Sequence, residues 1–407
     1  MIIRPARRLG QVHEYYFSRK LSEIAQMNQQ GAPVLNLGIG SPDLPPPPQV
    51  VDVLKRHSND PHAHSYQSYR GLAELRAAFA KWYERHFEVA LHPDREVLPL
   101  IGSKEGIMHL AMTWLEAGDE VLVPDPGYPA YAAASRLAGA KVRTYPLCAS
   151  HGWLPDLDQL QRTDLSRVKL MWVNYPHMPT GAPATAELFA ALVAFAKKHH
   201  VLLVNDNPYS FILNDRPLSI LSVAGAKEVA VELNSLSKSH NMAGWRIGLL
   251  AGKAEYLSEV LRFKSNMDSG MFKPAQLAAV AALEAEDAWY EALNAEYRHR
   301  KAWAQRLLTA LGCTFDTCQV GMFVWARVPA RWPDAFAMSD DLLQRARLFL
   351  TPGGIFGQQG QAWIRVSLCN PPAVWREAMK RLERAGLITP ATQADCPAPC
   401  LPKGQVH

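Results

Sequence analysis

The feature that most constrains the fold is an alternation of short apolar runs with helical stretches. The apolar runs, suited to buried strands, cover residues 96–101, 168–173, 201–205, 229–233 and 247–251. A helical pattern at 185–199 separates two of them. Such alternation favours a mostly parallel sheet with helices on both faces, whose ligands bind beyond the carboxyl ends of the strands. Asp206 and Lys238 both follow a predicted strand.

The length of the chain predicts two lobes. At 407 residues with 48% hydrophobic content, the chain can bury a large core and exceeds the usual size of one domain. We expect an N-terminal arm with part of a small domain (1–46), a large domain (47–290), a C-terminal small domain (291–387) and a disordered tail (388–407).

Composition excludes several classes of function. The 43 basic and 38 acidic residues leave a net charge of +5 and are scattered, so nucleic-acid binding is not expected. No apolar run approaches the roughly 18 residues of a membrane span, and the start lacks an apolar signal core, which predicts a cytoplasmic protein. The six cysteines form no Cys-x-x-Cys pair, which indicates reduced thiols and no metal site.

The segment from Ser235 to Gly248, with the sequence SLSKSHNMAGWRIG, places a lysine where a reactive amine is useful. Lys238 follows a predicted buried strand and would enter a cleft. An ordinary lysine, with a pKa of about 10.4, is a poor nucleophile at neutral pH. Burial beside a second cation lowers that pKa, and Arg246 lies eight residues further on.

Other stretches offer groups suited to binding a small anionic ligand. The turn 102–106 joins a predicted strand to a helix, where unpaired backbone N–H groups and the positive end of the helix dipole attract anions. Tyr128 lies between glycine and proline and could stack on a planar cofactor. Arg365 lies on a predicted strand and could bind a carboxylate with two parallel bonds. Gly40 ends a short strand and allows close approach of the backbone.

The pattern Ser-x-Ser-Lys followed by Gly-x-Arg-x-Gly resembles the lysine segment of the class I/II aminotransferases, the fold-type I enzymes that depend on pyridoxal phosphate. The stretch Lys264-Ser-Asn-Met-Asp-Ser-Gly270 is more narrowly similar to the LL-diaminopimelate aminotransferase branch. The resemblance implies an α/β fold with a mostly parallel seven-stranded sheet flanked by helices and a small α+β domain built from both chain ends. It also implies a homodimer with shared active sites that acts on an α-amino acid and a 2-oxo acid.

The resemblance also implies a role for each matching residue. Lys238 would form the Schiff base with the cofactor, Asp206 would keep the pyridine nitrogen protonated, and Tyr128 would stack on the ring. The substrate would be bound by Gly40, Arg365 and Tyr15. Further cofactor contacts would come from Ser103, Lys104, Asn174, Tyr209, Ser235, Ser237 and Arg246, and from Tyr66 of the neighbouring subunit.

One position departs from the family pattern. The family sequence Asn-x-Pro-x-Asn-Pro-Thr-Gly matches residues 174–181, but Met178 replaces its second asparagine. A thioether cannot donate a hydrogen bond, so one cofactor contact of the family is missing. Asn174 remains at the first asparagine.

Several alternatives stay open at this point. The same fold supports C–S lyases, decarboxylases and racemases, and a non-enzymatic regulator that binds pyridoxal phosphate is a further class. Among transaminases, the stretch 264–270 favours a long polar donor such as LL-diaminopimelate. The aromatic residues 15–17 and Phe272 would instead favour alanine or a larger apolar amino acid. A screen of amino donors against 2-oxoglutarate and pyruvate separates these cases.

Overall fold

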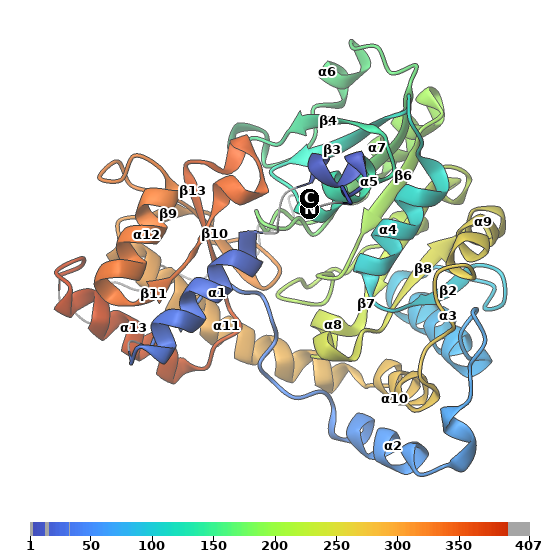
Figure 1. The fold of residues 1–407 in the computed structure, drawn as a ribbon, viewed down its shortest axis with the longest axis horizontal. Helices are drawn as coiled ribbons and strands as arrows, with labels where there is room; N and C mark the ends of the chain where they lie inside the picture. Colours follow the sequence, from blue (N-terminus) through green and yellow to red (C-terminus); the bar gives the residue numbers. More distant parts are fainter. Residues whose placement is uncertain (1–2, 13–15, 32, 390–407) are drawn as a thin grey trace, which may run out of the picture.

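The computed structural model describes residues 3–12, 16–31 and 33–389, which build two units around separate sheets (Figure 1). The larger sheet has seven strands, as predicted. In spatial order they are β2 (Val97–Leu100), β8 (Gly248–Gly252), β7 (Ala230–Ser235), β6 (Leu202–Asp206), β5 (Val168–Val173), β3 (Glu120–Asp125) and β4 (Lys141–Pro146). The pairs from β7 to β4 are parallel, and β8 is antiparallel to both of its neighbours.

Two details of this sheet were not predicted. The strand β8 is reversed: the chain turns back within residues 236–247, so that β8 runs antiparallel to β7. The edge strand β4 lacks an apolar run, since most of its residues are exposed or partly exposed.

Helices cover both faces of the large sheet. Adjacent residues of β6 point to opposite faces: Leu203 belongs to one core with Phe79 and Leu192, and Val204 to another with Leu110 and Trp172. The helices of this unit are α2 (Pro48–Ser58), α3 (Ala73–Phe87), α4 (Ser103–Trp114), α5 (Pro129–Leu137), α6 (Leu157–Gln161), α7 (Ala186–His199), α8 (Leu236–Ser239), α9 (Ala254–Lys264) and α10 (Lys273–Leu283). Short 3-10 helices are η2 (Pro61–His64), η3 (Ala149–His151), η4 (Ile220–Ser222), η5 (Ala226–Glu228) and η6 (Ala243–Trp245).

The second unit is built from both ends of the chain. Its antiparallel sheet has the order β12 (Thr351–Pro352), β13 (Trp363–Ser367), β10 (Phe323–Arg327) and β9 (Thr314–Phe315). Beside it, β1 (Leu35–Asn36) from the N-terminal part pairs in parallel with β11 (Leu348–Phe349). Its remaining elements are α1 (Tyr16–Gln29), α11 (Asp287–Ala310), α12 (Ala335–Ala346), η7 (Gly353–Phe356), η8 (Gln358–Gly360) and α13 (Pro372–Arg384). The N-terminal 3-10 helix η1 (Arg7–Gln11) instead lies against α5 of the large unit.

The long helix α11 runs from one unit into the other (Figure 1). Tyr290 belongs to the core of the large sheet, whereas Leu293 and Tyr297 belong to the core of the second unit. We therefore propose that the boundary between the domains lies in this helix. Ile388 is still buried in the second core, and the predicted disordered tail falls, from residue 390 on, outside the described residues.

Two expectations from composition can be compared with the structure. Cys148, Cys313 and Cys369 are free thiols, but Cys318 is disulfide-bonded, so the expectation of reduced thiols is wrong at that position. No helix in the described part of the chain combines the length and apolar character needed to cross a lipid bilayer.

Candidate active site

The candidate active site is a cavity of about 510 Å³ between the two units. Its walls include the carboxyl ends of β6 and β7 and residues of α1, β10 and β13. Twelve of the residues predicted for the site line it: Gly40, Ser103, Lys104, Tyr128, Asn174, Asp206, Tyr209, Ser235, Ser237, Lys238, Arg246 and Arg365. Residues far apart in the sequence therefore meet at the strand ends, where parallel sheets bind ligands.

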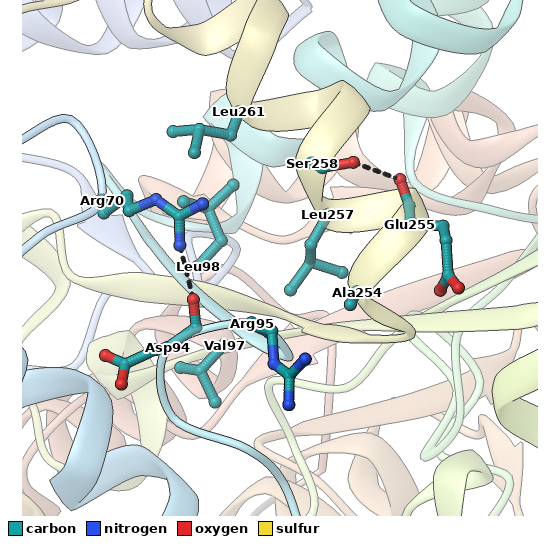
Figure 2. Close-up of a pocket in the computed structure, with 10 residues that line it drawn as sticks. All are labelled: Arg70, Asp94, Arg95, Val97, Leu98, Ala254, Glu255, Leu257, Ser258 and Leu261. Atoms are coloured by element: carbon teal, nitrogen blue, oxygen red, sulfur yellow. Dashed lines mark hydrogen bonds between the residues drawn. The ribbon is translucent and has the colours of Figure 1, made fainter.

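Two predicted residues are not among those that line the cavity. Tyr66 is 90% exposed and projects from the segment before α3. Tyr15 lies outside the described residues. A separate cavity of about 310 Å³, between β2 and α9, holds none of the predicted residues (Figure 2). Because none of the predicted residues lines this cavity, the larger cavity is the better candidate.

Lys238 reaches the cavity from the short helix α8, which follows β7 directly. The hydroxyl of Ser235 caps this helix by accepting a bond from the backbone N–H of Ser237 at 3.1 Å. The Lys238 ammonium donates to the carbonyl of Gly40 at 2.6 Å. Burial lowers the pKa of Lys238 to about 8, and the charges of Arg365 and Arg246 contribute to this shift while Cys369 opposes it.

Asp206, the last residue of β6, is buried at the base of the cavity. Its Oδ2 accepts a hydrogen bond from the Tyr131 hydroxyl at 2.8 Å, while Oδ1 has no hydrogen-bond partner among the described residues. Burial raises the pKa of Asp206 to about 6; the bond from Tyr131 opposes this shift and the charge of Glu232 adds to it. A buried acceptor without a partner is costly, so this oxygen is suited to a donor supplied by a ligand.

Tyr131 is a site residue that the sequence analysis missed. It lies on α5, three residues after Tyr128, the residue that precedes this helix, and residues at this spacing lie on one side of a helix. Its ring stacks on Trp172 with 5.0 Å between the centroids, and it meets the Tyr128 ring edge to face at 5.6 Å. The i, i+3 spacing was a visible signal, but its partner Asp206 is 75 residues away.

The start of α4 forms an anion-binding end of the cavity. Gly102 precedes this helix without a side-chain cap, so the first N–H groups are open to a ligand. The hydroxyls of Ser103, Ser235 and Ser237 line the same cavity, together with Arg246. Only glycine suits position 102, because φ is +78° and a Cβ would lie 2.2 Å from an Arg246 nitrogen.

Met178 contacts the predicted substrate arginine. Its Sδ accepts a bond from Arg365 Nη1 at 3.2 Å, and its backbone N–H donates to Asn174 Oδ1 at 2.9 Å. The side-chain amide of Asn174 in turn donates to the backbone carbonyl of Asp206. The residue that departs from the family pattern therefore orients the guanidinium of Arg365.

Aromatic rings surround the guanidinium of Arg365, which is buried on β13. Its Cζ lies 4.0 Å from the ring centre of Phe323, 4.7 Å from Phe356 and 5.7 Å from Phe17. Its Nη2 donates to the carbonyl of Gly38 at 2.9 Å. A cation with little access to water binds a carboxylate more strongly than an exposed one does.

These groups fit pyridoxal phosphate. The uncapped start of α4, the serine hydroxyls and Arg246 suit its phosphate, and the free Oδ1 of Asp206 suits a protonated ring nitrogen. Lys238, with its lowered pKa, suits its aldehyde.

One cluster of metal-ligand types lies outside the cavity. Glu105, His109 and Asp268 bring ligand atoms within 4.8 Å of one another. However, the buried ammonium of Lys264 already binds both oxygens of Asp268, at 2.7 and 2.8 Å. We therefore interpret the group as an ionic network that joins α4 to residues 264–268.

Comparisons with known proteins agree with this geometry. Residues 32–382 match the model of the family described as aminotransferase class I and II. The LL-diaminopimelate aminotransferase of Dehalococcoides mccartyi is 41% identical over 379 residues, covering 93% of this chain and 97% of that protein. That of Desulforudis audaxviator is 42% identical, covering 93% and 96%.

Solved structures show the same architecture. Substrate-bound BacF from Bacillus subtilis has a TM-score of 0.91 at 35% identity and covers 97% of this chain and 100% of its own. The aspartate aminotransferase of Thermus thermophilus with maleate has a TM-score of 0.87 at 27% identity, with coverages of 94% and 100%.

Proposed function

We propose that this chain, which belongs to the class I and II aminotransferases and is a transaminase dependent on pyridoxal phosphate, takes LL-diaminopimelate as its amino donor. The observation that carries the proposal is the identity of about 40% to LL-diaminopimelate aminotransferases over more than 90% of both chains. The enzyme moves an amino group between an α-amino acid and a 2-oxo acid.

The bound cofactor acts as an electron sink for the bonds at the substrate Cα. The residues of the chain position the substrate and move its proton. Arg365 binds the α-carboxylate, and the Cα–H bond then faces the Lys238 amine. The free Lys238 amine would be well suited to carry a proton, because its pKa of about 8 lies near neutral pH.

The side chain of LL-diaminopimelate ends in an ammonium and a carboxylate. Among the described residues that line the cavity, Asp206 is the one carboxylate, and it is assigned to the cofactor. The distal ammonium therefore needs an acceptor such as Ser18 or a group from a second subunit.

A second candidate donor is a large apolar amino acid. The residues Phe17, Leu21, Ile39, Phe323 and Phe356 form an apolar part of the cavity wall. An apolar pocket discriminates weakly between neighbouring side-chain sizes, by about 10- to 200-fold, whereas a site built for polar groups rejects a substrate without them by about 10⁴-fold.

The test is kcat/KM for a series of donors with 2-oxoglutarate or pyruvate as acceptor. The proposal expects one strongly preferred polar donor, LL-diaminopimelate. Comparable turnover of alanine, leucine and phenylalanine would contradict it and favour the apolar candidate. Release of ammonia and pyruvate from a donor when no 2-oxo acid acceptor has been added would instead indicate a lyase.

We also propose that the active unit is a homodimer in which Tyr66 serves the neighbouring site. Two segments carry exposed apolar side chains that are unusual for a free surface: Tyr66 and Tyr69 in one, and Met267 and Phe272 in the other. The two segments pack on each other, since a Cβ at Gly270 would lie 2.6 Å from the Gln67 carbonyl. A partner subunit would cover this surface and receive the Tyr66 side chain.

A further inference from the structure

Asp125 joins the two units of the structure near the rim of the candidate active site. It is the last residue of β3 in the large sheet. Its carboxylate accepts two backbone bonds from the second unit, at Oδ1 from the N–H of Gln359 at 3.0 Å and at Oδ2 from that of Gln358 at 3.2 Å. These N–H groups begin the 3-10 helix η8, in the connection between β12 and β13. The side chain thus caps a helix that belongs to the other unit.

Two further features hold Asp125 close to residues 357–359: a glycine that leaves room for its carboxylate, and a hydrogen bond between the two backbones. A Cβ at Gly357 would lie 2.0 Å from Asp125 Oδ1, and φ at this glycine is +140°, so a side chain there would be both strained and crowded. A third bond runs from the N–H of Gly127 to the carbonyl of Phe356 at 2.8 Å. Three hydrogen bonds therefore fix residues 125–127 to residues 356–359.

Both joined segments carry rings of the cavity wall. Tyr128 follows Gly127 directly, and Phe356 is the residue that accepts the third bond. The Phe356 ring is buried and lies 4.7 Å from the Arg365 guanidinium carbon. The position of the 356–359 segment therefore sets one side of the enclosure around Arg365.

The negative charge of the Asp125 carboxylate strengthens its bonds with the N–H groups of Gln358 and Gln359. Asp125 has no ion pair within the described part of the chain, and hydrogen bonds to an ionised acceptor are stronger than those to a neutral one. Burial raises the pKa of this carboxyl, and the two N–H bonds oppose that shift.

We propose that Asp125 is a positioning residue for amino-acid binding, which holds residues 356–359 against β3 so that Phe356 packs on Arg365. The inference rests on the proposed function, in which Arg365 binds the substrate carboxylate. According to this inference, Asp125 affects how tightly the amino acid binds, but it neither retains the cofactor nor transfers a proton.

Two variants test the contact from its two sides. Asp125→Asn keeps the shape of the side chain but removes its charge and one acceptor. Gln358→Pro keeps Asp125 and removes one donor at the first position of a helix, where proline is tolerated. Each should raise KM for the amino donor roughly ten-fold, with kcat within about two-fold and cofactor affinity unchanged. Because both changes act on the same contact, their effects should not add, and KM of the double variant should be no higher than that of the more impaired single variant.

The controls separate this inference from the proposed function. Asp215→Asn, an exposed aspartate outside the cavity wall, should leave KM unchanged. Arg365→Lys should raise KM strongly; if it does not, the proposed role of Arg365 fails. If Arg365→Lys raises KM but neither Asp125→Asn nor Gln358→Pro does, or if these two lower only the melting temperature, Asp125 has no role in substrate affinity. Should Asp125→Asn not fold, Gln358→Pro alone decides the question by the same criteria.

Discussion

The ammonium of Lys238 donates a hydrogen bond to the backbone carbonyl of Gly40 at 2.6 Å. Lys238 follows a strand of the large sheet, whereas Gly40 belongs to the segment that continues from β1 in the second unit. The contact therefore places the reactive amine at the boundary between the units, beside the backbone expected to receive the substrate carboxylate.

The first prediction concerns the reactivity of Lys238. With a pKa of about 8, roughly 10% of this amine is neutral at pH 7, far more than for an ordinary lysine. The rate at which the cofactor-free protein takes up pyridoxal phosphate, followed by absorbance, should rise up to about pH 8 and then level off. Lys301, whose pKa is also lowered to about 8 but which lies outside the cavity wall, offers the matched control. Lys301→Met should keep the same profile, and a rate that still climbs at pH 10 would refute the lowered pKa.

The second prediction concerns Asp206, whose pKa burial raises to about 6 in the cofactor-free protein. Below this pH the carboxyl is protonated and cannot pair with a positively charged ring nitrogen, so the affinity for pyridoxal phosphate should fall on acidification. Tyr131→Phe removes a bond that lowers this pKa, and the loss of affinity should then begin at higher pH. Asp206→Asn should remove the pH dependence and lower kcat by about 10²- to 10³-fold. An unchanged midpoint in Tyr131→Phe would contradict the assignment.

The third prediction concerns Met178, which accepts a bond from Arg365. Met178→Leu keeps a similar volume but removes the sulfur, so the guanidinium loses one contact that orients it. We expect KM for the amino donor to rise a few-fold with kcat nearly unchanged. Met178→Asn restores the family residue and serves as the comparison. A fall in kcat alone would place Met178 in the chemistry rather than in substrate binding.

The fourth prediction concerns the proposed sharing of sites between subunits. A Tyr66→Phe chain lacks a group for its neighbour, and a Lys238→Ala chain lacks its own lysine. If Tyr66 serves the partner, a mixed dimer contains one sound site, and activity should return on mixing towards about half of the wild-type value per mixed dimer. Size-exclusion chromatography measures the dimer itself. No recovery on mixing, although Tyr66→Phe alone is inactive, would mean that Tyr66 acts within its own chain.

The sequence predicted those parts of the site that depend on local pattern. Asp206 ends one apolar strand, Lys238 lies three residues after the end of another, and the turn before α4 joins a strand to a helix. Their place at one edge of the sheet therefore follows from the parallel topology. The apolar run at 247–251 predicts the strand β8 but not its reversed direction, and the exposed edge strand β4 leaves no apolar run to detect.

The aromatic enclosure of Arg365 could not be predicted in the same way. Phe17, Phe323 and Phe356 come from three elements that are far apart in the chain, and each is an ordinary core residue in its local pattern. Their common function depends on how the small sheet, α1 and the 353–360 loop pack together, which no local motif encodes. The contact between Asp125 and residues 358–359 likewise spans more than 230 residues of sequence.

The central claim is that Lys238 is the residue that binds the cofactor, and chemical trapping tests it most directly. Reduction of the loaded enzyme with borohydride, followed by proteolysis and mass spectrometry, fixes the pyridoxyl group to whichever lysine carries it. We predict that the label lies on Lys238, in the peptide that also contains Ser235 and Ser237. A label on Lys104, which also lines the cavity, or on Lys264 would contradict the assignment.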